Sequence, residues 1–163
     1  VLEGCDGAGK TSIAKALVRA SSDFHKVVHV SNPSSLEEGR ETFTELVAVL
    51  NASRGLVYDR AQVGERVYSP LKRGYYPEYM DALDKQVGRR TLFVLVTAPS
   101  DALHERYDGK FITEDEIDAV AERFYAEFMR APLKSKTVVD TSLVTPEQAA
   151  WWIMCLCGSK GRL

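Results

Sequence analysis

The sequence predicts an α/β fold in which a five-stranded parallel sheet is covered by helices on both faces. Five short runs of β-branched or apolar residues alternate along the chain with amphipathic segments, and strands that alternate with helices form parallel sheets. One of these runs, residues 91–97, is apolar almost throughout, as expected of a strand that is buried on both faces. A glycine-rich turn at residues 4–11 joins the first run to the first amphipathic segment.

The elements can be assigned in order along the chain. Strands are predicted in five segments: residues 1–3, 26–30, 55–58, 91–97 and 137–139. A helix is predicted at residues 11–20 because its apolar residues recur at helical spacing. Three further helices are expected to open at capping boxes, in which Ser or Thr is followed three residues later by Glu or Gln. These boxes are Ser35 with Glu38, Thr113 with Glu116, and Thr145 with Gln148.

Residues 60–79 lack a hydrophobic period and contain Gly64, Pro70, Gly74 and Pro77. We expect a long loop with short helical pieces in this region. Loops of such length in compact domains are usually functional.

Length and composition predict a single domain that spans residues 1–163. The chain has 21 basic and 23 acidic residues, a net charge of -2, which argues against non-specific binding to nucleic acid or anionic membrane. No segment reaches the roughly 20 apolar residues of a membrane span. The three cysteines favour mostly buried, reduced thiols and a cytoplasmic location. Because numbering starts at Val1, without Met and inside a strand, we expect a short piece to precede it.

The glycine-rich turn matches the pattern G-x-x-x-x-G-K-[ST] in full, between a predicted strand and a predicted helix. Glycines let backbone N–H groups turn inward around phosphates, and the following helix points its positive end at the same place. Lys10 should reach the β- and γ-phosphates of ATP, and the Thr11 hydroxyl should bind Mg²⁺. A chance glycine turn is disfavoured because both neighbouring elements are present. The ATP-binding residues predicted here are Gly4, Asp6, Gly7, Ala8, Gly9, Lys10, Thr11 and Ser12.

The third predicted strand is followed by Asp59 and Arg60. A hydrolysing ATPase commonly carries an Asp-Glu pair at such a position, and a GTPase carries an Asn-Lys-x-Asp guanine reader, but neither pattern is present. An Asp followed by Arg suits phosphoryl transfer between two substrates. Asp59 can hold Mg²⁺ through water, completing a metal site with Thr11, and Arg60 can bind the phosphate under attack. A surface ion pair or turn is the alternative interpretation of this dipeptide.

Together these motifs resemble those of thymidylate kinases. Residues 1–11 are similar to that family's opening E-G-x-D-G-x-G-K-[ST], and Asp59-Arg60 to its D-R-[YFHS] motif. Tyr68 lies nine residues after Asp59, where the family places an aromatic residue beside the deoxyribose. The resemblance spans the chain and is sharpest in these two motifs. It implies a P-loop kinase fold with a small lid, at about residues 106–113.

The resemblance also implies roles for the matching residues. Asp6 would approach the 3′-hydroxyl of the acceptor sugar, and Arg60 would bind its phosphate. Glu65 and Tyr68 would contact its base and sugar. The predicted substrate-binding set is Asp6, Arg60, Glu65, Tyr68 and Arg73.

Two cations of the predicted lid complete the proposed machinery. Arg106 would lie over the transferred phosphoryl group as a catalytic residue, and Lys110 would bind ATP there, because phosphoryl transfer depends on positioning and charge neutralisation. A solvated helix end is the alternative interpretation of both. The predicted catalytic set is Lys10, Asp59, Arg60 and Arg106.

The sequence also departs from the thymidylate kinase pattern. Asn32-Pro33 stands where that family has an Arg-Glu-Pro segment, so its phosphate-binding arginine is missing unless Arg40 replaces it. Glu65 is acidic where a neutral amide or hydroxyl is usual, and Ala61 replaces an aromatic residue. The segment from Asp59 to Gly74 is more similar to divergent, often phage-encoded relatives, which would place the protein in a host cytoplasm. In such relatives the acceptor is less certain.

Three functions follow from these observations. The first is ATP-dependent phosphoryl transfer to a deoxynucleoside monophosphate, a small-molecule acceptor for which dTMP is the first candidate. The second keeps the chemistry but acts on a hydroxymethylated pyrimidine within DNA, and it draws on a local basic patch of Arg66, Lys72 and Arg73. The third is a non-catalytic nucleotide-binding switch, against which the intact motif residues speak. The sequence leaves the oligomeric state open, with a homodimer as one possibility.

Overall fold

The computed structural model describes residues 1–30 and 32–158. Its centre is a five-stranded parallel sheet with the strand order β2-β3-β1-β4-β5. The strands are β1 (Leu2–Glu3), β2 (Lys26–His29), β3 (Leu56–Asp59), β4 (Phe93–Thr97) and β5 (Lys136–Asp140). The predicted fold class and all five predicted strands are confirmed.

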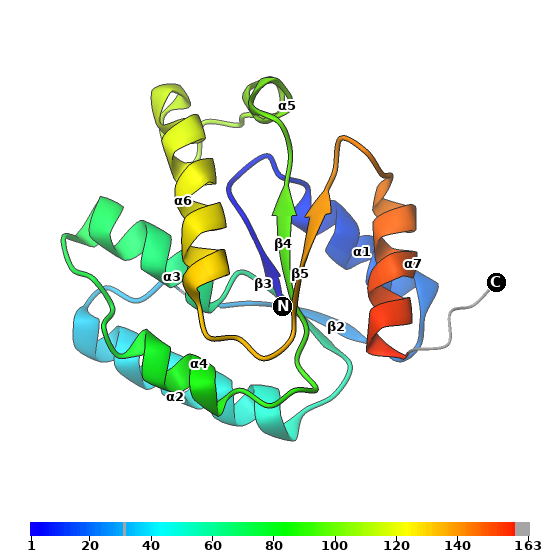
Figure 1. Cartoon of the computed structure of the whole chain (residues 1–163), viewed down its shortest axis with the longest axis horizontal. Helices are drawn as coiled ribbons and strands as arrows, with labels where there is room; N and C mark the ends of the chain where they lie inside the picture. Colours follow the sequence, from blue (N-terminus) through cyan, green and yellow to red (C-terminus); the bar gives the residue numbers. More distant parts are fainter. Residues whose placement is uncertain (31, 159–163) are drawn as a thin grey trace.

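Helices cover both faces of this sheet (Figure 1). Helices α1 and α7 pack together on one face, and α3 and α6 lie on the other, while α2 packs against α4. The helices are α1 (Lys10–Ala20), α2 (Leu36–Ala52), α3 (Gln62–Tyr68), α4 (Met80–Gln86), α5 (Ser100–Glu105), α6 (Ile117–Arg130) and α7 (Pro146–Cys157). A π-helical turn, Ser69–Arg73, extends α3, and a 3-10 turn, Glu114–Glu116, leads into α6.

The sheet places the motif strand at its centre. β1 lies between β3 and β4, and Leu2 of β1 is paired with Asp59 at the end of β3. In parallel sheets the carboxyl ends of all strands meet at one edge, which is where ligands bind. The glycine-rich turn and Asp59-Arg60 therefore emerge side by side at that edge.

The predicted capping boxes form with one difference. At Thr113 and Thr145 both reciprocal hydrogen bonds are present. At α2 the Ser35 hydroxyl accepts from the backbone N–H of Glu38, but the Glu38 carboxylate accepts from the backbone and hydroxyl of Ser34 instead of returning to Ser35. The helix start is capped all the same.

The region 60–79 is more regular than its sequence predicts. Residues 62–73 form one continuous helical stretch, and all seven residues of α3 are buried. A helix that is buried on every side has no apolar stripe, so no helical period is visible in its sequence. The short helices α4 and α5 also escaped prediction, because six or seven residues give too few turns for a periodic signal.

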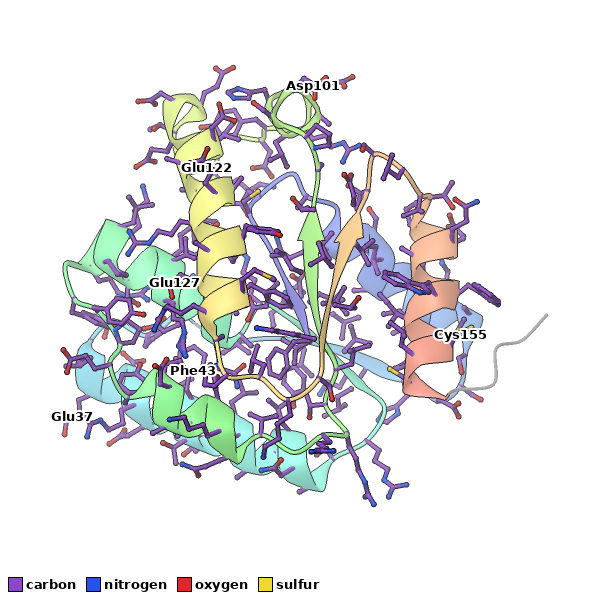
Figure 2. The ribbon with its side chains drawn as sticks, viewed as in Figure 1. Glu37, Phe43, Asp101, Glu122, Glu127 and Cys155 are labelled. Atoms are coloured by element: carbon purple, nitrogen blue, oxygen red, sulfur yellow. The ribbon has the colours of Figure 1, made fainter. Side chains whose placement is uncertain are left out.

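The core lies between the sheet and its helices. Figure 2 shows Phe43 directed from α2 into the interior, whereas Glu37, Asp101 and Glu122 extend outward. Of the three cysteines only Cys5 is buried, and Cys155 and Cys157 are exposed on α7, so the expectation of mostly buried thiols is wrong. Within the described residues, none of the helices combines the length and apolarity needed to cross a membrane.

Candidate active site

The glycine-rich turn runs from β1 into α1 with a backbone that only glycine adopts easily. Gly4, Gly7 and Gly9 have φ angles of +140°, +77° and +96°. A Cβ atom on Gly4 would lie 2.1 Å from the carbonyl oxygen of Val96, far inside van der Waals contact. Gly9 is the N-cap of α1 and offers no capping side chain, so the first N–H groups of the helix stay available to an anion.

Lys10 lies across this turn. Its side chain is buried, and its ammonium group donates hydrogen bonds to the carbonyl oxygens of Gly4 (2.9 Å) and Cys5 (2.7 Å). Burial, with the nearby charge of Arg60, lowers the pKa of Lys10, and Asp59 and Asp6 oppose that shift. The two carbonyl partners of this ammonium group are neutral, and a phosphate at the turn would give it a negatively charged partner.

Thr11 and Asp59 meet beside Lys10. The Thr11 hydroxyl donates a hydrogen bond of 3.1 Å to Oδ2 of Asp59. Asp59 is buried, and its other oxygen, Oδ1, has no hydrogen-bond partner among the described residues. A buried carboxylate oxygen without a partner is costly, and hydroxyl and carboxylate oxygens are ligands that Mg²⁺ accepts. The donor set therefore fits the predicted Mg²⁺ site.

Arg60 follows Asp59 in a conformation that non-glycine residues seldom adopt. Its φ angle is +70°, and its backbone N–H donates to the carbonyl oxygen of Leu2 (2.9 Å). Its guanidinium forms a salt bridge with Asp6 of the glycine-rich turn. Left-handed residues of this kind cost on the order of 1–3 kcal/mol and concentrate at functional sites.

The segment 106–113 has no strand or helix and lies over the same site. Arg106 donates a hydrogen bond of 2.9 Å to the Thr141 hydroxyl, which in turn donates to the carbonyl oxygen of Ala8 (3.0 Å). Lys110 pairs with Asp108 at 2.6 Å on the surface. Among the described residues, Arg106 is thus linked through Thr141 to the glycine-rich turn, whereas Lys110 pairs only within its own segment.

These groups line one pocket of about 590 Å³. It contains every predicted catalytic and metal-binding residue and most of the predicted ATP-binding residues: Asp6, Gly7, Gly9, Lys10, Thr11, Ser12, Asp59, Arg60, Arg106 and Lys110. The two other predicted ATP-binding residues, Gly4 and Ala8, are buried in the turn and do not line the pocket. Polar and charged side chains predominate in the pocket, which suits a phosphate ligand.

Five residues that line this pocket were not among the predicted site residues: His29, Val30, Asn32, Asp108 and Phe111. Two of them, His29 and Phe111, lie close to Asp59 and Arg60. His29 ends β2, and its Nδ1 lies 3.7 Å from Oδ2 of Asp59. Phe111 comes from the 106–113 segment, and its ring centroid lies 4.7 Å from the Arg60 guanidinium carbon. The position of His29 at the carboxyl end of a strand could have signalled it, whereas Phe111 lies in the predicted lid segment but was not singled out there.

Three of the predicted acceptor-binding residues lie outside this pocket, in α3 and the turn after it. Glu65 is buried, and its carboxylate is paired with Arg73 at 2.5 Å and accepts from the Tyr75 hydroxyl at 3.0 Å. Tyr68 is buried against Phe124, with ring centroids 5.5 Å apart. Burial raises the pKa of Tyr68. That these residues bind the acceptor stays a prediction.

The expected basic patch does not form a free positive surface. Arg66 is fully buried and paired with Asp84 (2.6 Å) and Asp81 (2.7 Å), and Lys72 is paired with Glu116 at 3.0 Å. Arg73 is occupied by Glu65, as described above. A cation that is buried and paired within the protein is not available to a DNA backbone.

Glu3 is a further buried residue that sequence reasoning left unassigned. Its carboxylate is completely buried and accepts from the backbone N–H groups of Val63 (2.9 Å) and Gly64 (3.1 Å). Burial raises its pKa to about 7, and these hydrogen bonds oppose the shift. Glu3 thereby joins the motif strand to the start of α3. An acidic residue inside a buried strand was the available signal.

A larger hollow of about 1200 Å³ lies at the opposite edge of the sheet. It is lined by the segments that enter the strands, such as Gly55 and Thr91, and by no residue of the glycine-rich turn or of the Asp59-Arg60 pair. We place the candidate site in the smaller pocket, because chemistry-bearing side chains converge there at the carboxyl ends of the strands.

Comparison with known proteins shows the fold. No protein-family model and no curated protein matches the chain. Among solved structures it is similar to the YorR protein from Bacillus subtilis, crystallised in complex with phosphorylated GDP, with a TM-score of 0.79 and 19% identity over 96% of this chain and 94% of that one. It is also similar to shikimate kinase from Acinetobacter baumannii in complex with shikimate, with a TM-score of 0.52 and 17% identity over 95% and 89% of the two chains. The chain has the P-loop kinase fold.

Proposed function

We propose that this protein transfers the γ-phosphate of ATP, with Mg²⁺, to a small nucleotide, and that a pyrimidine deoxynucleoside monophosphate such as dTMP is the acceptor. The observation that carries this proposal is the convergence of Lys10, the Thr11–Asp59 pair and Arg60 in one pocket. These are the groups that a donor triphosphate, its metal ion and an acceptor phosphate require.

The donor half of the proposal rests on the glycine-rich turn. Its inward N–H groups and the N-terminus of α1 would bind the β- and γ-phosphates, and Lys10 would exchange its carbonyl partners for phosphate oxygens. Thr11 and Asp59 would hold Mg²⁺, the latter through water, and the ion would neutralise charge on the transferred group. Arg106 lies within the same pocket and would neutralise charge from the other side.

The acceptor half rests on Arg60. Its side chain lines the pocket together with the glycine-rich turn. The guanidinium has paired N–H donors that can bind two phosphate oxygens at once. An acceptor oxygen attacks the γ-phosphorus, the bond from phosphorus to the β-bridging oxygen breaks, and ADP leaves. A phosphate monoester is already ionised near neutral pH, so it needs no general base. The phosphorylated guanine nucleotide in the YorR crystal supports a nucleotide as ligand.

The alternatives have less support. Phosphorylation of a hydroxymethylated pyrimidine within DNA would use the same donor site, but the cations expected to bind the strand are buried or paired. A non-catalytic switch would not need Arg60 and Arg106 beside the phosphate turn. The predicted homodimer and cytoplasmic location remain proposals that the catalytic scheme does not require.

A panel of acceptors tests the function. Purified protein with [γ-³²P]ATP and Mg²⁺ is offered dTMP, dUMP, dCMP, hydroxymethyl-dUMP, GMP, shikimate, and DNA with or without hydroxymethyluracil. We expect label on a pyrimidine deoxynucleotide and none on DNA. Label on DNA alone would favour the second function, and label on no acceptor at any ATP concentration would contradict transfer to these classes.

A further inference from the structure

Phe111 is unusual among the pocket residues, because it is a large apolar side chain in a polar setting. Its side chain is 46% exposed, and its neighbours in the segment 106–113 include the charged residues Arg106, Asp108 and Lys110. Burial in the hydrophobic core therefore does not explain its position. In the pocket it lies close to the Arg60 guanidinium, whose central carbon lies 4.7 Å from the ring centroid.

A second ring contacts the same guanidinium. The Tyr68 ring centroid lies 5.5 Å from the central carbon of Arg60 and 6.3 Å from the Phe111 ring centroid. Tyr68 is itself fixed, since it is buried and packs edge-on against Phe124. A guanidinium within about 6 Å of a ring face is attracted by the ring quadrupole. Arg60 therefore has one buried aromatic contact, Tyr68 of α3, and one exposed aromatic contact, Phe111.

The rings and Asp6 engage different parts of Arg60. Rings attract the face of a guanidinium and leave its N–H edge free for an anion. In this structure Asp6 pairs with that edge. An acceptor phosphate could thus replace Asp6 while both ring contacts persist.

We propose that Phe111 is a positioning residue, which with Tyr68 holds Arg60 in the orientation that binds the acceptor phosphate. Until the acceptor binds, Asp6 pairs with the N–H groups of Arg60 that would bind this phosphate. This proposal rests on the proposed function and deepens it, because it couples the 106–113 segment to acceptor binding. ATP binding alone does not require the contact between Phe111 and Arg60.

The test compares three variants. Phe111→Leu keeps an apolar side chain but removes the aromatic face, and Phe111→Tyr keeps the face. Tyr125→Leu removes an aromatic residue of similar exposure, 53%, from α6 outside the pocket and serves as the matched control. Steady-state kinetics are measured separately for the acceptor and for ATP, and the thermal midpoint is recorded for each protein.

For Phe111→Leu we expect the acceptor kcat/KM to fall about tenfold, which corresponds to about 1.4 kcal/mol and lies within the range of cation–π interactions. The KM for ATP and the thermal midpoint should stay close to wild type, and Phe111→Tyr should restore acceptor use. Equal losses for ATP and acceptor, a loss in Phe111→Tyr as large as in Phe111→Leu, or no loss would each overturn the positioning role.

A second measurement does not depend on turnover. In protein labelled with ¹⁵N-arginine, the Arg60 Nε–Hε signal is assigned by its absence from Arg60→Lys. Stacking against two rings should move the chemical shift of this proton upfield of its usual range in wild type and Phe111→Tyr. In Phe111→Leu the displacement from that range should be smaller. An unchanged signal in Phe111→Leu would overturn the contact itself, even in a protein that phosphorylates none of the acceptors offered. Wild-type inactivity with the expected shift would contradict only the proposed function and leave the contact supported.

Discussion

Arg60 and Asp6 form a salt bridge that joins the end of β3 to the glycine-rich turn. Both side chains are largely shielded from solvent, with 22% and 13% exposure, so each loses a partner if the other turns away. The salt bridge engages one guanidinium nitrogen, Nη2, so an anion that takes over this nitrogen displaces the Asp6 carboxylate. Under the proposed function, the salt bridge would link acceptor binding to the conformation of the glycine-rich turn.

Arg60→Ala should impair acceptor use far more than ATP binding. Removal of a phosphate-binding arginine costs on the order of 10²-fold or more in acceptor kcat/KM, whereas the backbone of the turn still binds ATP. Titration calorimetry with ATP and steady-state kinetics with the acceptor separate the two effects. The surface variant Arg19→Ala, which removes an exposed pair with Glu147, is the control. Equal weakening for both ligands would show that Arg60 does not face the acceptor.

Asp59→Asn should raise the Mg²⁺ concentration required for half-maximal transfer. The amide removes the negative charge that faces the ion, while its oxygen can still accept from Thr11 at the 3.1 Å separation found here. We expect an increase of about tenfold or more, measured by Mg²⁺ titration at saturating ATP. Thr44→Val removes an exposed hydroxyl that donates only to a helix carbonyl and should leave the titration unchanged. An unaltered Mg²⁺ dependence in Asp59→Asn would place the ion elsewhere.

Glu3 should make stability depend on pH in a defined direction. Its pKa is raised from 4.5 to about 7 by burial, so between these values the folded protein binds more protons than the unfolded chain. The contribution of Glu3 to the free energy of unfolding then falls as pH rises through this window, because it is complete below pH 4.5 and is lost as pH rises through about 7. Asp84, with a pKa raised to about 6 by burial, acts in the same direction.

Urea unfolding between pH 4.5 and 8 measures this slope. Glu3→Gln cannot titrate, so its slope should be less negative than that of wild type by up to about 1.4 kcal/mol per pH unit near pH 6. The slopes are compared rather than the absolute stabilities, because the variant also alters the hydrogen bonds to Val63 and Gly64. Identical slopes would show that Glu3 does not titrate in this range.

The segment 106–113 should exchange its amide hydrogens rapidly without ligand. It has few buried apolar side chains, and Lys110 is held only by Asp108 within the segment. A bisubstrate mimic that joins ATP to the acceptor should slow exchange there by bridging Arg106 and Arg60. Hydrogen exchange followed by mass spectrometry measures both states. Equal protection with and without the mimic would remove the lid role.

The fold was predictable because its signals are local. The glycine pattern at residues 4–11, the capping residues Thr113 and Thr145, and the apolar run at 91–97 each identify an element from a few neighbouring residues. The conformation of the glycine-rich turn was predictable for the same reason, since it lies in one contiguous motif.

The surroundings of Arg60 and Glu65 were harder to predict because they depend on contacts between distant segments. The salt bridge of Arg60 with Asp6, the stacking of Phe111 on Arg60 and the pairing of Glu65 with Arg73 have no counterpart in the linear pattern. The buried helix α3 hides its own period, so the direction of Glu65 and Arg66 could not be deduced. These are the residues whose predicted roles the structure revises or leaves open.

We propose that this pocket moves the γ-phosphate of ATP to an acceptor. ³¹P NMR of ATP, Mg²⁺ and dTMP, or the acceptor found in the panel, follows donor and product in one sample. We expect ADP and phosphorylated acceptor to appear in equal amounts, at a rate that falls at least about 10²-fold in Lys10→Ala while circular dichroism shows a folded protein. ADP formed with free phosphate and no acceptor product, or a near-normal rate in Lys10→Ala, would contradict the claim.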